Sequence, residues 1–362
     1  MKKVYTVTFH MANNYGALLQ TYALQKILLK KYETKVLNYD NYAISNTYRI
    51  IKKGTLNVVK IFGRVVKKMP YIKQEIERIN NFNKFRNNIL VTKYFTQIDE
   101  FNHENIDCII TGSDQVWNPN LTGNIDPIYF LDFDFKGKKI SYAASCGDIN
   151  NLNDNSVDVI KNINSISVRE DSLNKYLKSK DINDVETVLD PTLLLSKEDW
   201  KNIINSEKIE KEKYIFAYSV ANETEEYIKF VNDVANYTNL KIVFFDKKQN
   251  QFNKNKKSYY KAGPSEFLNL LFNAEYVITT SFHGFALSSI FNKKVFVLLS
   301  TGPDRITSLA KKISLEDRIV KENDNIKTLL EKEINWKKTN ELLEKEKKQS
   351  IEWLYNNIDG VK

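Results

Sequence analysis

Short apolar runs alternate with amphipathic stretches in the first half of the chain. The β-rich runs predict strands at residues 4–9, 35–39, 106–111, 139–144, 165–168 and 186–189. After the first run, small and apolar side chains recur at helical spacing from Ala17 to Leu28. Strand–helix–strand units with short loops form parallel sheets that are covered by helices. The pattern therefore predicts an α/β fold.

A second alternating series begins at Tyr214. Its predicted strands lie at residues 214–220, 240–245, 276–280 and 295–299, and its predicted helices at 224–237, 264–272 and 284–291. A lysine-rich stretch at 247–261 is expected to be a solvated loop. Since 362 residues exceed what one hydrophobic core usually supports, we expect two Rossmann-like domains facing a cleft. The predicted boundaries are 1–195, 196–320 and 321–362, the last being C-terminal helices.

A predicted helical insertion at about 49–100 interrupts the first series. Within it, residues 56–68 place Val58, Phe62 and Val65 on one helical face, with basic side chains largely elsewhere. A basic amphipathic helix can lie on an anionic membrane. The alternative is a helix that packs on its own domain with its lysines in water.

Composition narrows the class of protein. The chain has 54 Lys and Arg against 45 Asp and Glu, so its net charge of +9 favours anionic partners. Two cysteines and three histidines, without a CxxC or HxxxH pair, make a structural zinc site improbable. The start of the chain lacks the apolar core of a signal peptide, and no run approaches the ~20 apolar residues of a membrane span. We expect a cytoplasmic protein, with peripheral membrane contact through 56–68 as an option.

Four polar turns follow predicted strands, where side chains can reach a ligand. They are Asn13-Asn14-Tyr15-Gly16, the segment from Thr111 to Pro119, Ser167-Val168-Arg169-Glu170-Asp171, and Ser281-Phe282-His283-Gly284. Free N–H groups at a helix N-terminus suit an anion or a hydroxyl. An arginine can hold a phosphate or carboxylate through two hydrogen bonds, and a histidine can transfer protons near neutral pH.

Each turn also has a structural interpretation. The asparagines of the first turn can cap a helix, and Asp114 can do the same in the second. Trp117 can fill the core, and Arg169 can form a salt bridge with Glu170 or another acid. The histidine can simply satisfy backbone groups.

Taken in order, these turns resemble the polysaccharide pyruvyl transferase family, from Thr8 to about Arg318. The segments that carry the resemblance are Asn13 to Gln20, Gly112 to Asn118, Ser141 to Ser145, Ile166 to Glu170, Leu189 to Leu194, and Ser281 to Gly284. The resemblance implies a fold of the GT-B glycosyltransferase type. It also implies transfer of a pyruvyl group from phosphoenolpyruvate to two hydroxyls of a sugar, as a ketal, in surface polysaccharide synthesis.

The resemblance also implies roles for individual residues, and it implies no metal, cofactor or nucleic acid. His283 is the candidate acid and Asp114 the candidate base. The candidate donor-binding residues are Arg169, Ser281, Phe282, Gly284 and Arg305. The candidate acceptor-binding residues are Asn13, Asn14, Tyr15, Gly16, Ser113, Gln115, Trp117 and Asn118. The acceptor is expected to be a sugar or a lipid-linked oligosaccharide.

One departure from the family pattern keeps alternatives open. Well-studied members carry Arg-Leu ahead of the histidine, where this chain has Ser281-Phe282. Arg305 or a lysine could replace that cation, or the donor could differ. The alternatives are a GT-B glycosyltransferase that uses a nucleotide sugar and a non-catalytic relative at the membrane surface.

Overall fold

The structure is a computed structural model of the 362-residue chain. It describes residues 1–48, 71–204, 207–220, 224–246, 252, 255–299, 303–322 and 324–360. The amphipathic stretch at 56–68 lies outside the described residues. The chain divides into two compact units. The first comprises Met1–Lys73, Phe82–Leu194 and Glu346–Lys362, and the second comprises Gln74–Asn81 and Leu195–Lys345.

The described part of the first unit is built on a seven-stranded sheet with the order β3-β2-β1-β4-β5-β6-β7. Every pairing in it is parallel. The strands are β1 (Lys3–Val7), β2 (Glu33–Tyr39), β3 (Val91–Phe95), β4 (Cys108–Thr111), β5 (Lys138–Ala144), β6 (Ser165–Val168) and β7 (Val185–Thr187). The central strands are apolar because both faces of the sheet are covered.

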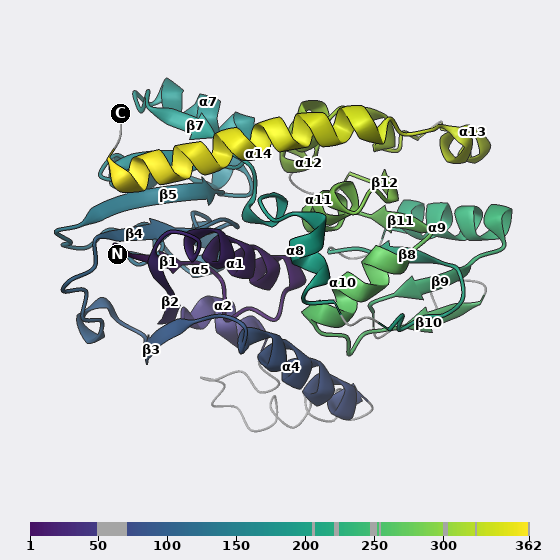
Figure 1. The fold of residues 1–362 in the computed structure, drawn as a ribbon, viewed down its shortest axis with the longest axis horizontal. Coiled ribbons are helices and arrows are strands. Elements are labelled where there is room, and N and C mark those ends of the chain that lie inside the picture. The colour runs from purple at the N-terminus through teal and green to yellow at the C-terminus, as the bar shows by residue number, and fades with distance from the viewer. Residues whose placement is uncertain are drawn as a thin grey trace. The chain divides into compact units, whose positions relative to one another are not determined.

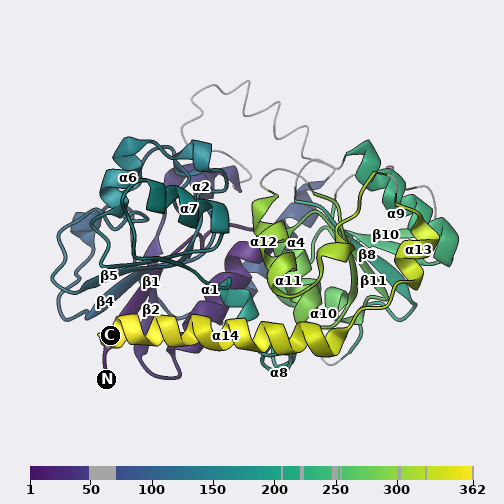
Figure 2. The ribbon, with the colours of Figure 1, turned by 90° about the horizontal axis from the view of Figure 1, so that it is seen from above.

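Helices cover the sheet of the first unit on both faces. Figure 2 shows α6 (Asp154–Ile160) and α7 (Asp171–Ser179) on one face, and α1 (Tyr15–Leu28) with the end of α14 (Trp336–Asp359) on the other. The hydroxyl of Tyr355 in α14 donates to the carbonyl of Ile27 in α1 at 2.9 Å. The unit also contains α2 (Tyr42–Thr47), α5 (Pro119–Thr122) and both ends of α4 (Ile72–Arg86), whose middle, Gln74–Asn81, belongs to the second unit.

The second unit has a five-stranded parallel sheet in its described residues, with the order β10-β9-β8-β11-β12. The strands are β8 (Tyr214–Tyr218), β9 (Lys241–Phe244), β10 (Lys256–Ser258), β11 (Tyr276–Thr279) and β12 (Lys294–Val297). The helices are α8 (Lys197–Lys201), α9 (Glu225–Thr238), α10 (Pro264–Asn273), α11 (Phe282–Ile290), α12 (Asp304–Lys312) and α13 (Ile326–Glu331). In Figure 1 these elements run from teal through green to yellow.

The two doubly wound units confirm the predicted α/β class, but two strands were missed. The predicted helical insertion at 49–100 contains β3, and the predicted loop at 247–261 contains β10. Both are edge strands in which most residues are exposed or half-buried, so their sequences lack the apolar run that marks a buried strand.

The chain ends differ from the predicted domain scheme. The division between the units falls at Leu194/Leu195, but the last residues, Glu346–Lys362, return to the first unit. There, the ring of Trp353 lies 6.4 Å from that of Tyr142, and the Ser350 hydroxyl accepts the N–H of Leu189 at 3.0 Å. The part of α14 that begins at Glu346 therefore belongs to the first unit.

Candidate functional site

The strand order puts the polar turns at the switch point of each sheet. In the first unit the chain proceeds outward from β1 in one direction and from β4 in the other, so the loops after β1 and β4 are neighbours. In the second unit β8 and β11 have the same relationship. Ligands of such sheets bind beyond the carboxyl ends of the strands at the switch point. The segments Asn13–Gly16 and Ser113–Asn118 occupy the first switch point, and Ser281–Gly284 occupies the second.

Asp114 has a strained backbone at the first switch point. Its φ is +82°, a left-handed conformation that residues other than glycine rarely adopt. The backbone of Asp114 is held there because its carbonyl accepts N–H groups from Val116 at 2.8 Å and Ser145 at 3.0 Å. Its side chain is half-buried, and Oδ1 accepts the N–H of Gln115 at 2.9 Å. Backbone strain of this kind clusters at functional sites, and it persists only where the surrounding structure holds the residue in place.

A buried polar network lies directly beneath this loop. The Ser113 hydroxyl donates to Asp190 Oδ2 at 2.8 Å, and Arg169 Nη1 donates to the same oxygen at 3.1 Å. Arg169 Nε donates to Glu170 Oε1 at 3.2 Å, and the Ser145 hydroxyl donates to that oxygen at 2.7 Å. The network thus ties the ends of β4, β5 and β6 to the turn after β7.

The same network extends to β1 and α1. Gln20 Nε2 donates to the Thr8 hydroxyl at 2.8 Å, and that hydroxyl donates to the carbonyl of Ser113 at 2.8 Å. Thr192 donates to Asp190 Oδ1 through both its N–H and its hydroxyl. Five of the six segments that carried the family resemblance therefore meet in one buried cluster. Their shared role is to hold the loop that contains Asp114.

The positive charge of Arg169 is balanced by two carboxylates inside this network. Burial disfavours its charged form, but the carboxylates of Glu170 and Asp190 outweigh that effect and raise its pKa above the ordinary value. Its side chain is only 1 % exposed. Two buried carboxylates pair with the guanidinium, and contact between Arg169 and the donor stays a prediction. The alternative of a salt bridge to Glu170 is confirmed.

Other predicted acceptor contacts are buried in the first unit. Trp117 is 0 % exposed and packs 6.2 Å from the ring of Phe130, so it fills the core. Ser113 is buried within the network, and Tyr15 is buried against the ring of Phe82. Gly16 is buried inside α1. These four residues support the turns from below, and their direct contact with an acceptor stays a prediction.

The half-buried polar residues at the first switch point are Asn13, Asn14, Asp114 and Gln115. Asn14 caps α1 by accepting the N–H of Ala17 at 3.2 Å. Gln115 Oε1 accepts from the amide of Asn118, a buried residue that itself caps α5. The contact of Asn14 matches the structural interpretation, in which the asparagines of the first turn cap a helix. The Asp114 carboxyl and the Gln115 amide still lie at the sheet edge.

Arg86 is a residue that sequence reasoning missed. From the end of α4 it donates to the carbonyls of His10, Met11 and Ala12 and to Asn13 Oδ1, at distances from 2.7 to 3.0 Å. Burial lowers its pKa to about 10, still high enough to keep it charged. Arg86 therefore fixes the loop between β1 and α1. Nothing in the local pattern links residue 86 to residue 10, because α4 reaches the loop only in the folded unit.

In the second unit, α11 begins directly after β11. Ser281 caps the helix, with its side chain accepting the N–H of Gly284 at 3.3 Å. The Thr279 hydroxyl accepts the N–H of Ser281 at 3.0 Å and donates to the carbonyl of Tyr218 at 2.6 Å. A Cβ at Gly284 would lie 2.6 Å from Thr279 Oγ1, so glycine is required for this approach.

His283 stands in the first turn of α11. Its side chain lies in an edge-on contact with Phe282, with ring centroids 5.2 Å apart, and the residue is 9 % exposed. The positive end of the helix dipole favours an anion at this terminus. Arg305 lies in the first turn of α12, at intermediate exposure. His283 and Arg305 belong to the second unit, whereas Asp114 and Arg169 belong to the first.

Among the described residues, no group of three or more His, Cys, Asp or Glu side chains is arranged to hold a metal ion. No helix in the described part of the chain has the length and apolar character needed to cross a membrane.

Comparisons with solved structures agree with the fold described above. The chain resembles a UDP-N-acetylglucosamine 2-epimerase from Rickettsia bellii at 13 % identity and a TM-score of 0.55, over 100 % of this chain and 98 % of that one. A second UDP-N-acetylglucosamine 2-epimerase gives 11 % identity and a TM-score of 0.51, over 100 % and 97 %. These proteins have the GT-B-type fold, and at such low identity the likeness shows the fold alone. A search of functionally curated proteins found no match.

The family comparison is more specific. The model of the polysaccharide pyruvyl transferase family matches residues 14–301, which include the loop around Asp114, the buried network apart from Thr8, and the turn that carries His283. The chain belongs to the polysaccharide pyruvyl transferase family.

Proposed function

We propose that the chain transfers the pyruvyl group of phosphoenolpyruvate to two hydroxyls of a sugar acceptor in surface polysaccharide synthesis. The observation that carries the proposal is the placement of His283. It stands in the first turn of α11 at the switch point of the second sheet, within the part of the chain that matches the family. A proton donor beside a helix N-terminus suits a substrate that carries both a phosphate and a reactive carbon.

The reaction needs one proton delivered and two removed. Protonation of the methylene carbon by His283 gives oxocarbenium character to C2. A sugar hydroxyl forms a C–O bond to C2 and loses its proton. A second hydroxyl then attacks the same carbon and also loses its proton, while the bond between C2 and the phosphate oxygen breaks. One of the two protons restores His283, and the other leaves with the phosphate.

Two further side chains fit roles in this scheme. Asp114 is a half-buried carboxylate at the first switch point, and we assign it as the base that takes the hydroxyl proton. Arg305 is a cation at intermediate exposure in the second unit, and we assign it to the donor phosphate or carboxylate. Arg169 acts through Ser113 as a positioning residue for the Asp114 loop. The protein would work at the cytoplasmic side, where phosphoenolpyruvate is available.

A ligand-binding comparison tests the donor. A specific ligand at 100 times its dissociation constant stabilises a protein by about 2.7 kcal/mol. We expect phosphoenolpyruvate to raise the melting temperature and UDP-sugars to leave it unchanged. Phosphate release, followed by phosphorus NMR, should require a saccharide acceptor. Stabilisation by a nucleotide sugar together with indifference to phosphoenolpyruvate would reject the proposal.

A nucleotide-sugar-dependent glycosyltransferase is the second candidate. The observation that favours it is Ser281, which stands where well-studied family members carry an arginine. In this structure Ser281 caps α11 instead of offering a cation. The same binding comparison separates the two candidates. A protein that binds neither class of donor would fit a non-catalytic relative.

A further inference from the structure

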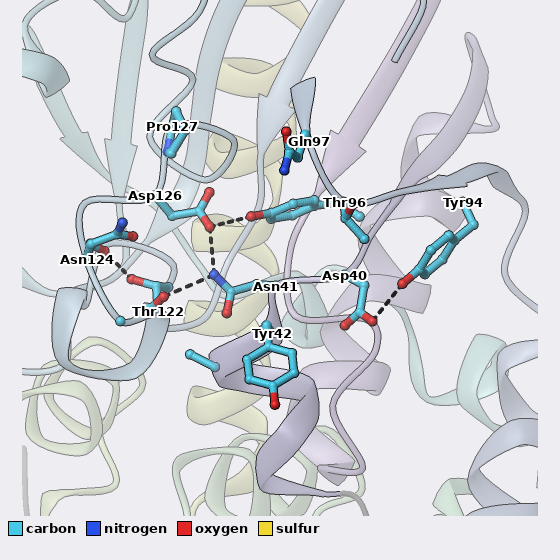
Figure 3. Close-up of a pocket in the computed structure, with 13 residues that line it drawn as sticks. Asp40, Asn41, Tyr42, Tyr94, Thr96, Gln97, Thr122, Asn124, Asp126 and Pro127 are labelled. Carbon is cyan, nitrogen blue, oxygen red and sulfur yellow. Dashed lines mark hydrogen bonds between the residues drawn. The ribbon is translucent and has the colours of Figure 1, made fainter. Parts of the chain in front are cut away.

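A polar cavity of about 580 Å³ lies in the first unit, beyond the carboxyl ends of β2 and β3. Its walls come from the loop after β2, the start of α2, the loop after β3 and the segment that follows α5, as Figure 3 shows. The volume is typical of a small-molecule site, about 300–1,000 Å³. None of the residues singled out by sequence lines it.

The floor of the cavity is held by an internal hydrogen-bond network. Asp126 Oδ2 accepts from the Tyr39 hydroxyl and from Asn41 Nδ2, each at 2.6 Å. Asp126 Oδ1 accepts the N–H groups of Ile128 and Tyr129 at 2.8 and 3.1 Å. Burial, followed by the charge of Asp126, raises the pKa of Tyr39, so its hydroxyl stays a donor. These groups therefore preorganise the cavity.

The walls present aromatic and amide groups to a ligand. Tyr94 is 55 % exposed, yet its hydroxyl donates to buried Asp40 at 2.9 Å, which limits the movement of the ring. Tyr42 is 48 % exposed on the opposite side of Asp40 in Figure 3. The exposed amides of Gln97 and Asn124 complete the walls. Aromatic faces that pack on C–H groups, with amides for hydroxyls, suit a sugar ring.

The charge of the cavity opposes the charge of the chain. Its 13 described lining residues include Asp40 and Asp126 but no Lys, Arg or His, whereas the whole chain carries +9. A phosphate or carboxylate would be repelled here. The cavity therefore disfavours an anionic donor, and its amide and hydroxyl groups suit an uncharged ligand that carries hydroxyls.

The cavity shares its sheet edge with the Asp114 loop. β3 pairs with β2, and β2 with β1, all in parallel, so their carboxyl ends lie along one edge. β1 pairs in turn with β4, which precedes the Asp114 loop. At ~4.8 Å between strands, β3 lies about 14 Å from β4, which a short oligosaccharide can span. We propose that the cavity binds an uncharged sugar residue of the acceptor glycan, separate from the residue that receives the pyruvyl group. The assignment to an acceptor rests on the proposed function.

The test measures glycan binding without any donor. The protein is applied to immobilised short neutral oligosaccharides and to matched ones that contain uronic acid. We expect binding to neutral glycans, weakened roughly five- to tenfold by Tyr94→Ala and by Tyr42→Ala, as for the loss of one aromatic face. Tyr237→Ala is the matched control, since Tyr237 is also 55 % exposed but lies in α9, outside the cavity.

The outcomes separate this inference from the proposed function. No glycan binding, equal binding by all variants, or a preference for uronic-acid glycans would overturn the cavity assignment, even if phosphoenolpyruvate is consumed. Binding that the two cavity variants weaken, without phosphate release from phosphoenolpyruvate, would keep the cavity as a sugar site and reject the donor.

Discussion

Arg169 Nη1 lies 3.1 Å from Asp190 Oδ2, although the two residues are 21 positions apart in the sequence. Both side chains are almost completely buried, and the Ser113 hydroxyl donates to the same carboxylate oxygen. Since Asp114 follows Ser113, this pair supports the candidate base from beneath. The family segments around these residues therefore support the candidate site from within the first unit.

Removing one member of that pair should destabilise the first unit. Asp190→Asn leaves a buried guanidinium with only one of its carboxylate partners, and we expect about 3 kcal/mol less free energy of unfolding. Urea unfolding measures the loss. Asp154→Asn is the control, because Asp154 and Lys180 form an exposed ion pair, 2.9 Å long, whose loss should change little. Equal stability of both variants would show that the buried pair is not a structural support.

The backbone conformation of Asp114 and the charge of its side chain can be tested separately. At φ +82°, Asp114→Gly should be as stable as the wild type or up to about 1 kcal/mol more stable, because glycine adopts this conformation without strain. Asp114→Asn should also fold, since asparagine tolerates the left-handed region. Both should lose turnover by at least about a hundredfold if the carboxylate is the base. Thermal unfolding and phosphate release give the two readings, and full activity in Asp114→Asn would exclude a base.

His283 should matter for turnover without mattering for folding. His283→Gln keeps a polar side chain in the first turn of α11 and removes the proton donor. We expect at least about a hundredfold loss of phosphate release, with the melting temperature nearly unchanged. Ser289→Ala, in the same helix, is a control that should keep turnover. A large fall in melting temperature with unchanged specific activity would make His283 structural.

The close approach of Gly284 to Thr279 predicts steric sensitivity. Gly284→Ala would place a Cβ 2.6 Å from Thr279 Oγ1, and we expect a loss of about 1–3 kcal/mol in the free energy of unfolding. Adding Thr279→Ala should restore part of that loss. Gly112→Ala is the matched control, because its nearest neighbours would lie at 3.4 Å. Comparable losses in both single variants, measured by urea unfolding, would argue against a specific clash.

Glu210 gives the second unit a defined acid sensitivity. Burial alone would raise its pKa, but Lys257, Lys241 and Tyr259 donate to Oε2 at 3.1 to 3.2 Å and lower the pKa from 4.5 to about 2. The depressed pKa means that this contribution to stability is complete above pH 4.5 and is lost as the pH falls toward 2. Stability should therefore fall more steeply over that window in the wild type than in Glu210→Gln. Parallel curves, from denaturant unfolding at each pH, would contradict the assignment.

The amino-acid sequence by itself determined the repeated α/β pattern, because buried parallel strands are apolar along their whole length. The strand predicted at 165–168 coincides with β6, and those near 139 and 276 differ by a residue. The ordered turns also determined the family, since their residue types are conspicuous next to each strand. The edge strands β3 and β10 were not predicted because they are short and lack the continuous apolar run of a buried strand.

Only the tertiary structure decided which polar residues reach the sheet edge. Trp117 and Arg169 looked suited to ligands, yet one is core and the other is neutralised by Glu170 and Asp190. The burial of a side chain depends on which strands become neighbours, and the local hydrophobic periodicity does not specify the strand order. The same holds for two features that join segments far apart in the chain. Arg86 donates hydrogen bonds to the loop after β1, and the cavity beyond β2 and β3 is lined by several separate segments.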